Sequence, residues 1–429
     1  MRTALASGAV TLVAAGAFFI TLYLFALTLA ALLGRAPRVG DGPAQRRFAI
    51  LIPAHNEVEL IGRLLRNLND LDYSAEQYDV CVVADNCDDL TALTAISLGA
   101  DVYERVDHLR QGKGYALRWL LQQLRDKGRE YDAFVVLDAD SVVSRNFLRR
   151  MDARLESGSQ VIQAYYQVLN AADSRLTGLR YAALAALHYL RPMGRAALHL
   201  SCGLKGNGMC FSAALLERFG WRWFTLAEDV EFHLALVNEG VRVDFEKDAT
   251  VLADMPVSFA QANSQNQRWE QGRVAMIRQW IPALILGGVR QVSPLRLDAA
   301  IEQLIPPLSV PFAAAVACGL LAIGLGAHEA IVLAALALAG QIVYLLVGLM
   351  LVHAPLQAYL ALTAAPSYIA WKLALYGQAL SPAKRPVGCA QLEPLPLSPQ
   401  GSVYAVRHER HSAMSTIRQA NSNQSCKNR

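Results

Sequence analysis

The chain has 429 residues, of which 54% are hydrophobic, and a formal net charge of +4. The length suits one large domain or two ordinary ones, and the hydrophobic fraction exceeds that of an average soluble domain. The mild charge, with no basic stripe interleaved with aromatic residues, argues against a nucleic-acid partner. The seven cysteines form no CxxC pair, so we expect neither a zinc cluster nor a disulfide framework.

The excess of apolar residues lies first near the N-terminus, where residues 4–33 carry no charge. About 20 apolar residues span a bilayer as a helix, so residues 1–34 are predicted to hold a transmembrane helix. A secretory signal peptide is the alternative. The apolar core of a signal peptide is shorter than this stretch, and no clear small-x-small cleavage site follows here. Arginine outnumbers aspartate in the segment that follows, which predicts that this flank faces the cytoplasm. The residues concerned are Arg35, Arg38, Arg46 and Arg47 against Asp41.

Between residues 35 and 290, short apolar runs alternate with helical patterns, which is typical of βαβ units and a mostly parallel sheet. The runs at residues 48–54, 78–85 and 131–140 are predicted strands, each followed by a helical pattern. In such folds ligands bind at the carboxyl ends of the strands. Acidic residues stand at two of these ends, namely Asp85 and the pair Asp138 and Asp140.

The pair Asp138 and Asp140 can reach one hard divalent cation, Mg²⁺ or Mn²⁺, that leaves positions open for phosphate oxygens. The alternative is that the two aspartates are simply solvated at the end of a strand and bind no metal. The stretch also matches the DxDx(T/V) start of haloacid-dehalogenase-type phosphatases, in which the first aspartate is a nucleophile. Those domains open with this strand, whereas three βα units precede it here.

Glu228 and Asp229 stand at the start of a predicted helix, where free N–H groups favour ionised carboxylates. This pair either caps the helix or, if it faces a cleft, supplies the general base that deprotonates a sugar hydroxyl. Asp229 and His233 are also spaced to pair or to share a metal. Lys113 begins another predicted helix without the spacing of a P-loop, so it either touches a phosphate or is solvated.

Gln265, Arg268 and Trp269 share one face of a helix predicted over residues 258–280. Arginine donates bidentately to phosphate, and tryptophan offers a flat ring on which a sugar stacks. A helix at a membrane interface also favours arginine and tryptophan. These three residues alone therefore leave both interpretations open.

A membrane region is predicted over residues 291–380, with spans at 305–325 and 330–352. Residues 355–380 form either a fourth span or an interfacial helix, because Pro366 interrupts the stretch and Lys372 lies inside it. The tail, residues 381–429, is basic and is expected to be cytoplasmic and disordered. A cytoplasmic tail requires three spans together with an interfacial helix.

The order of these motifs inside one α/β domain resembles the membrane-bound inverting glycosyltransferases of family 2, which include cellulose, chitin, hyaluronan and poly-N-acetylglucosamine synthases. Their motifs D, DxD, (T/E)D and QxxRW match Asp85, "DAD", "ED" and "QNQRW", and the resemblance covers roughly residues 45–380. It implies an α/β GT-A (Rossmann-like) domain with flanking transmembrane helices, a nucleotide-diphospho-sugar donor of the UDP-sugar kind, and Mg²⁺ or Mn²⁺. The chain would be a multi-pass protein of the inner or plasma membrane with a cytoplasmic catalytic domain.

The resemblance also implies which residues bind the donor. Asp85 would contact the nucleoside together with Glu57 of "PAHNE". Asp138 and Asp140 would hold the metal and the diphosphate, and Lys113 would contribute to binding the nucleotide sugar.

On the acceptor side, the resemblance makes Asp229 the base that deprotonates the acceptor hydroxyl, giving a β linkage from an α donor. Gln265, Arg268 and Trp269 would line the acceptor site and stabilise the leaving diphosphate, where charge develops. One departure from the family pattern is Ala227, which stands where the family has threonine. Another is the tail "YAVRHERHS", which is only loosely similar to the family's aromatic-x-Arg-Thr-x-Arg ending.

Three or four spans are few for an autonomous polysaccharide channel. The acceptor is therefore expected to be a growing polysaccharide, with an oligomer or an accessory export subunit as partner, or a glycolipid. A ceramide-type lipid glucosyltransferase, which can share QxxRW, is the nearest alternative. A phosphatase-like hydrolase and an inactive membrane-anchored binding protein are the alternatives from other classes.

Overall fold

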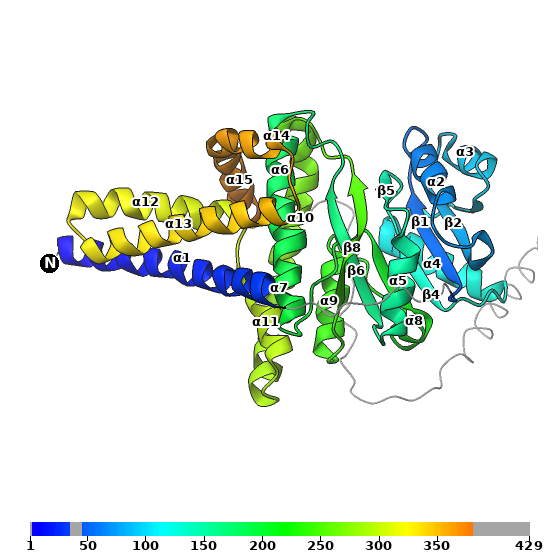
Figure 1. Ribbon diagram of the computed structural model, residues 1–429, viewed down its shortest axis with the longest axis horizontal. Coiled ribbons are helices and arrows are strands. Elements are labelled where there is room, and N and C mark those ends of the chain that lie inside the picture. Colours follow the sequence, from blue (N-terminus) through cyan, green and yellow to red (C-terminus); the bar gives the residue numbers. More distant parts are fainter. Residues whose placement is uncertain (1, 35–44, 381–429) are drawn as a thin grey trace, which may run out of the picture. The chain divides into compact units, whose positions relative to one another are not determined.

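Eight strands form one mixed sheet in the order β3-β2-β1-β4-β7-β6-β8-β5 in the computed structural model, which describes residues 2–34 and 45–380 (Figure 1). The strands are β1 (Phe48–Ala54), β2 (Tyr78–Asp85), β3 (Asp101–Arg105), β4 (Ala133–Val136), β5 (Ser141–Val143), β6 (Val161–Val168), β7 (Met209–Ser212) and β8 (Asp244–Ala253). The strands β1 to β4 are parallel, whereas β7 runs antiparallel to its neighbours β4 and β6. The predicted strands 48–54 and 78–85 are confirmed to the residue.

The predicted strand over residues 131–140 is wrong in its second half. The strand β4 ends at Val136, and Ser141 begins β5 at the far edge of the sheet, where it pairs with β8. Asp138 and Asp140 therefore lie in the connection between the two strands. The reason is that the chain must leave the β1–β4 neighbourhood and cross to the other edge, which a continuous strand cannot do.

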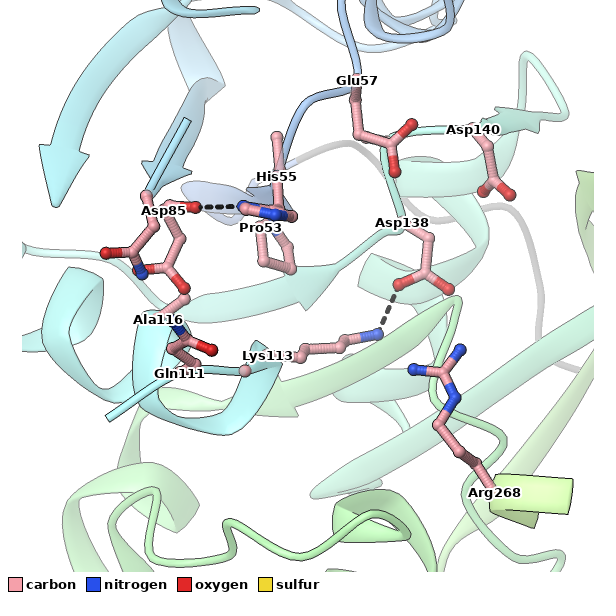
Figure 2. Close-up of a pocket in the computed structure, with 14 residues that line it drawn as sticks. Pro53, His55, Glu57, Asp85, Gln111, Lys113, Ala116, Asp138, Asp140 and Arg268 are labelled. Carbon is pink, nitrogen blue, oxygen red and sulfur yellow. Dashed lines mark hydrogen bonds and ion pairs between the residues drawn. The ribbon is translucent and has the colours of Figure 1, made fainter. Parts of the chain in front are cut away.

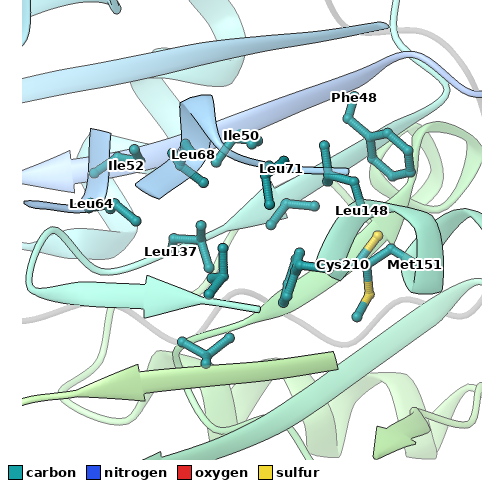
Figure 3. Packing of buried hydrophobic residues seen from close by; sticks show 14 of the residues in the cluster. Phe48, Ile50, Ile52, Leu64, Leu68, Leu71, Leu137, Leu148, Met151 and Cys210 are labelled. Atoms are coloured by element: carbon teal, nitrogen blue, oxygen red, sulfur yellow. The ribbon is translucent and has the colours of Figure 1, made fainter. Parts of the chain in front are cut away.

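Helices cover both faces of the sheet. They are α2 (Ile61–Asn69), α3 (Thr91–Ser97), α4 (Lys113–Asp126), α5 (Phe147–Glu156), α6 (Arg175–Leu184), a π-helical turn at Ala185–Leu190, α7 (Arg191–Ala197), α8 (Ala213–Phe219) and α9 (Glu228–Asn238). Alternate residues of β1 lie on opposite faces of the sheet, because successive side chains of a strand point in opposite directions. Ile50 and Ile52 pack with α2 and α5 (Figure 3), while Leu51 packs with α4, α8 and α9.

Within residues 2–34 and 45–380, two helices are long and apolar enough to cross a membrane, α1 (Arg2–Leu33) and α13 (His328–Leu351). The predicted span at 305–325 corresponds to α12 (Ser309–Leu325), which has 17 residues. It reaches spanning length only together with α11 (Pro294–Leu304), to which it is bent by 65°. The described residues therefore hold two or three candidate spans, and α1, α12 and α13 lie side by side (Figure 1).

The stretch at 355–380 contains two shorter helices, α14 (Leu356–Ala361) and α15 (Ala365–Leu380), and neither is among the candidate spans of the described residues. The helix predicted over residues 258–280 is longer in the structure, where α10 runs from Phe259 to Arg290. It packs against both α11 and α15. The predicted disorder of residues 381–429, and the charges at Arg35, Arg38 and Asp41, lie outside the described residues.

A buried arginine joins the α/β domain to the apolar helices. Arg195 of α7 is fully buried and pairs with Asp298 at 2.9 Å and Glu302 at 2.5 Å, both on α11. Tyr23 of α1 donates to Asp298 at 2.6 Å and accepts from Arg195 at 2.7 Å. A buried ion pair adds little net stability, but removing one partner leaves an uncompensated buried charge. The network therefore makes the relative placement of α1, α7 and α11 specific.

We expect Arg195→Met to lower the free energy of unfolding by about 3–5 kcal/mol, because two buried carboxylates lose their counter-charge. Thermal unfolding of the detergent-purified chain measures the loss. Arg149→Ala is the matched control, since Arg149 pairs with Asp72 where both side chains are exposed, and it should cost under about 1 kcal/mol. Equal losses from the two variants would contradict the role assigned to the network.

Candidate active site

A pocket of about 430 Å³ opens at the carboxyl ends of β1, β2 and β4 (Figure 2). These ends lie together because the parallel register pairs Ala54 with Ala84 and Leu51 with Val136. The pocket walls come from the loops after the strands, from the start of α4 and from α10. The polar lining residues are His55, Glu57, Asp85, Asn86, Gln111, Lys113, Asp138, Asp140 and Arg268. Six of the nine predicted site residues are therefore in one pocket.

Three carboxylates face the same side of this pocket, those of Glu57, Asp138 and Asp140 (Figure 2). Burial raises the pKa of Asp140 to about 6, and the charge of Asp138 contributes to the shift. Burial also raises the pKa of Glu57, with contributions from Asp140 and Asp138. The carboxylates thus repel one another, and a cation bound among them would relieve that repulsion.

Lys113 supplies one cation. Its Nζ donates to Asp138 Oδ1 at 2.5 Å and to the carbonyl oxygen of Gly206 at 2.5 Å. Burial disfavours the ammonium, but Asp138 and Glu228 outweigh this effect and raise the pKa of Lys113. The side chain is aimed into the pocket because Gly112, with φ of +116°, turns the chain at the start of α4. The alternative of a solvated helix start is therefore excluded for Lys113.

Asp85 ends β2 and lines the same pocket. Arg105 at the end of β3 donates to Asp85 Oδ1 at 2.5 Å, and Asn86 donates to the same oxygen at 3.1 Å. Both bonds are to Oδ1, which leaves Oδ2 for a ligand. The ring of His55 also bonds the backbone oxygen of Asp85 at 2.8 Å. Arg105 and His55 were not singled out from the sequence, although the parallel pairing of β2 with β3 places Arg105 next to Asp85.

The acidic pair begins α9, as predicted. Asp229 lies against Gly206, where an added Cβ would come within 3.3 Å of Asp229 Oδ2. Gly206 also has φ of +78°, so its backbone approaches Asp229 in a way that other residues cannot. Burial raises the pKa of Asp229, and burial together with Asp229 raises the pKa of Glu228 to about 7. One of two adjacent carboxyls is thereby poised to accept a proton near neutral pH.

His233 does not pair with Asp229. Its Nε2 lies 2.9 Å from Ser201 Oγ, and the side chain is buried. Burial lowers the pKa of His233 to about 4, so the ring is neutral at pH 7. The hydrogen bond to Ser201 replaces the pairing or shared metal that the spacing suggested.

The three residues of the "QNQRW" segment divide between two environments. Arg268 lines the pocket and points toward Asp138 (Figure 2). Gln265 instead accepts from Arg180 of α6 at 3.1 Å, and Trp269 lies with its ring centroid 5.9 Å from the Arg180 guanidinium. Trp269 is 46% exposed, so one face of its ring is free to contact a ligand. No sequence pattern marks Arg180, since only tertiary packing brings α6 to α10.

The residues fit a hard divalent cation. Carboxylate oxygens are the donors that Mg²⁺ and Mn²⁺ prefer, and Asp138 and Asp140 present two carboxylates to one pocket. Among residues 2–34 and 45–380, no group of three or more His, Cys, Asp or Glu side chains is arranged to hold a metal. A cation held by this pair therefore has coordination positions left for oxygen atoms of a ligand.

The mixed α/β sheet has the GT-A-like fold, with a carboxylate-lined pocket at its carboxyl edge. The family described as glycosyltransferase like family 2 matches residues 44–272, which is more than half of the chain. The chain belongs to this family and has candidate membrane helices. The predicted fold class and the predicted family are thereby confirmed.

Two curated relatives are similar at low identity. The beta-monoglucosyldiacylglycerol synthase of Synechocystis sp. is 24% identical over 276 residues, which cover 62% of this chain and 56% of that protein. The glucomannan 4-beta-mannosyltransferase 2 of Arabidopsis thaliana is 23% identical over 247 residues, covering 55% of this chain and 46% of that protein. The chain thus spans about half the length of the curated relatives it matches.

One solved structure supports the fold. The mannosyltransferase PcManGT from Pyrobaculum calidifontis, in complex with GDP-Man and Mn²⁺, superposes with a TM-score of 0.50 at 19% identity. The alignment covers 80% of this chain and 98% of that one. The likeness therefore extends beyond the sheet to helices that flank it.

The pKa of Asp229 is raised, and its carboxylate can act as a base only above that pKa. We therefore expect activity to fall on the acid limb of the pH–rate profile at a higher pH than the usual pKa of an aspartate would give. Glu228→Gln removes the adjacent negative charge and should move this limb down by about one pH unit. The measurement is kcat/KM for nucleoside diphosphate release between pH 5 and 9. Glu239→Gln, at the exposed far end of α9, is the control, and an unmoved limb in Glu228→Gln would refute the coupling.

Proposed function

We propose that the protein is a membrane-bound inverting glycosyltransferase that moves a hexose from a nucleotide-diphospho-sugar, of the UDP-sugar kind, to a lipid or saccharide hydroxyl. The observation that carries this proposal is the contact of Lys113 with both Asp138 and the Gly206 backbone. This contact joins the carboxylate-lined pocket to the loop that lies against Asp229. A donor bound in the pocket and Asp229 as base would thereby lie on opposite sides of the Lys113 side chain.

The donor would bind in the pocket at the carboxyl edge of the sheet. Asp85, through its free Oδ2, and Glu57 are the groups offered to the nucleoside part. The diphosphate would lie near Asp138 and Asp140, where Lys113 and Arg268 supply positive charge. A bound Mg²⁺ or Mn²⁺ would neutralise the diphosphate and so make it a better leaving group.

The chemical step would be a single displacement. Asp229 would accept the proton of the acceptor hydroxyl while that oxygen bonds to the anomeric carbon. The bond from the anomeric carbon to the diphosphate oxygen breaks, and the electron pair leaves with the diphosphate. Arg268 and Lys113 would stabilise the charge that develops there, and a donor of α configuration would give a β product.

The acceptor would be held between Asp229 and the apolar helices, with Trp269 as a stacking surface and Gln265 fixed by Arg180. The two or three candidate spans and the similarity to a glucosyldiacylglycerol synthase favour a lipid acceptor. The similarity to a glucomannan mannosyltransferase favours a growing polysaccharide as the second candidate, with an oligomer or export subunit as partner. We further propose that the catalytic domain faces the cytoplasm, since Arg46 and Arg47 follow the first candidate span.

Asp229→Asn should lower kcat for transfer by about 10²–10⁴-fold, because the amide cannot accept a proton, while donor binding is retained. Radiolabelled transfer measures the first quantity and equilibrium binding of UDP measures the second. Asp126→Asn, on the exposed end of α4, is the control and should leave both unchanged. Retained transfer in Asp229→Asn would remove this residue from the base role.

Arg268→Ala should lower kcat by about 10²–10³-fold, because the guanidinium in the pocket stabilises charge on the leaving diphosphate. The control is Arg278→Ala, which removes an exposed arginine from the same helix. Steady-state kinetics with saturating donor separates the kcat effect from a change in KM. If both variants keep wild-type kcat, Arg268 only shapes the pocket wall.

A further inference from the structure

The loop between α7 and β7 places a lysine beside the proposed base. Lys205 directly precedes Gly206, whose backbone lies against Asp229. Lys205 Nζ lies in the space next to Gly203, 3.3 Å from where a Cβ would be added to that glycine, and His233 borders the same space. Among the described residues, Lys205 Nζ has neither a hydrogen bond nor an ion pair. An ammonium held this way has its donors available for a ligand.

Arg191 is close enough to Lys205 and to Arg273 to lower the pKa of each, and neither arginine forms an ion pair with a carboxylate among the described residues. Arg191 of α7 donates through Nε to Tyr344 of α13 at 2.7 Å, and none of its bonds within the described chain is to an acid. Arg273 of α10 donates to the backbone oxygens of Ile305 and Glu302, and its buried Nε has no partner in the described chain. The cations of this cluster thus have donors that protein carboxylates do not use.

The acids near this cluster do not balance it. Asp298 and Glu302 are the carboxylates on the facing helix α11, and both pair with Arg195. Burial lowers the pKa of Lys205, Arg195 and Arg191 add to this shift, and Glu302 and Asp229 oppose it. Burial and Arg191 likewise lower the pKa of Arg273, against Glu270. Glu270 is itself paired with Lys372 at 2.9 Å. A surplus of positive charge is therefore concentrated between Asp229 and the apolar helices.

The position of the cluster indicates what it binds. Arg191 contacts α13, and Arg195 contacts α1, so the cluster lies where the two candidate spans meet the α/β domain. Buried cations without partners are costly unless an anion joins them. The donor diphosphate is accounted for by Asp138, Asp140, Lys113 and Arg268 in the pocket at the sheet edge. The cluster is therefore free to bind an anionic group of the other substrate.

We propose that Lys205, with Arg191 and Arg273, binds the phosphate of an anionic lipid acceptor and so holds its hydroxyl beside Asp229. This inference rests on the proposed glycosyl transfer and adds the class of acceptor. A phosphate accepts several charge-assisted hydrogen bonds, which suits one ammonium and two guanidinium groups. The lipid chains would extend along the apolar helices.

The test compares two acceptors that differ in the phosphate, phosphatidylglycerol and dioleoylglycerol, in detergent micelles with the full chain. A mixture of UDP-glucose, UDP-N-acetylglucosamine, UDP-galactose and GDP-mannose supplies donors, and labelled lipid product is measured. The wild-type chain should show a KM for phosphatidylglycerol at least about tenfold lower than for dioleoylglycerol.

Lys205→Met should raise the KM for phosphatidylglycerol about tenfold with a smaller change in kcat, and Lys205→Arg should restore the low KM. Lys247→Met removes a lysine that is paired at the surface and is the control.

The outcomes separate the two proposals. Equal use of both lipids by the wild-type chain, or an unchanged KM in Lys205→Met, overturns the anionic acceptor but leaves glycosyl transfer standing. Equal use of soluble sn-glycerol 1-phosphate and phosphatidylglycerol would show that the lipid chains do not contribute to recognition of the phosphate. That result also overturns the inference. Absence of nucleoside diphosphate release with every acceptor, including water, counts against the proposed function itself. The wild-type comparison decides the matter even if Lys205→Met fails to fold.

Discussion

The buried guanidinium of Arg195 is the interaction on which the arrangement of the site depends. It is fully buried and holds two carboxylates of α11 and the hydroxyl of Tyr23. Desolvating one cation and two anions is expensive, so the arrangement is stable only in the geometry that satisfies all of them. The backbone oxygen of Arg195 also accepts from Leu200 at 2.8 Å, which fixes the start of the loop that leads to Gly206. The same residue therefore places the apolar helices and the loop beside Asp229.

The site itself is an assembly of two halves. The pocket at the sheet edge is anionic, with four carboxylates against the two cations Lys113 and Arg268, which suits a donor that brings a diphosphate and a divalent cation. The space on the other side of Asp229 has a surplus of cations. Lys113 bridges the halves through Asp138 and Gly206. In the proposed reaction, the two substrates that react at one carbon would thus bind in regions of opposite electrostatic character.

The features that depend on neighbouring residues in the sequence were predictable from it. The strands at residues 48–54 and 78–85 were predictable because a short apolar run between turn residues has few alternatives. Asp138 and Asp140 were correctly placed at a strand end, although their strand stops earlier, because a chain crossing to another sheet edge leaves no local pattern. Arg105 could have been found from the parallel pairing of two consecutive strands, whereas Arg180 could not be assigned a partner, since its bond to Gln265 joins helices far apart in the chain.

The most direct measurement is the anomeric configuration of the product. Each of the four nucleotide sugars is offered as the pure α anomer to the purified full chain with Mg²⁺ or Mn²⁺ and lipid acceptor, and the glycosidic linkage is read from its proton coupling constants by NMR. Transfer from one donor with a β linkage is expected, because one displacement with Asp229 as base inverts the anomeric carbon. An α-linked product would require a different mechanism and would contradict a single displacement at this site.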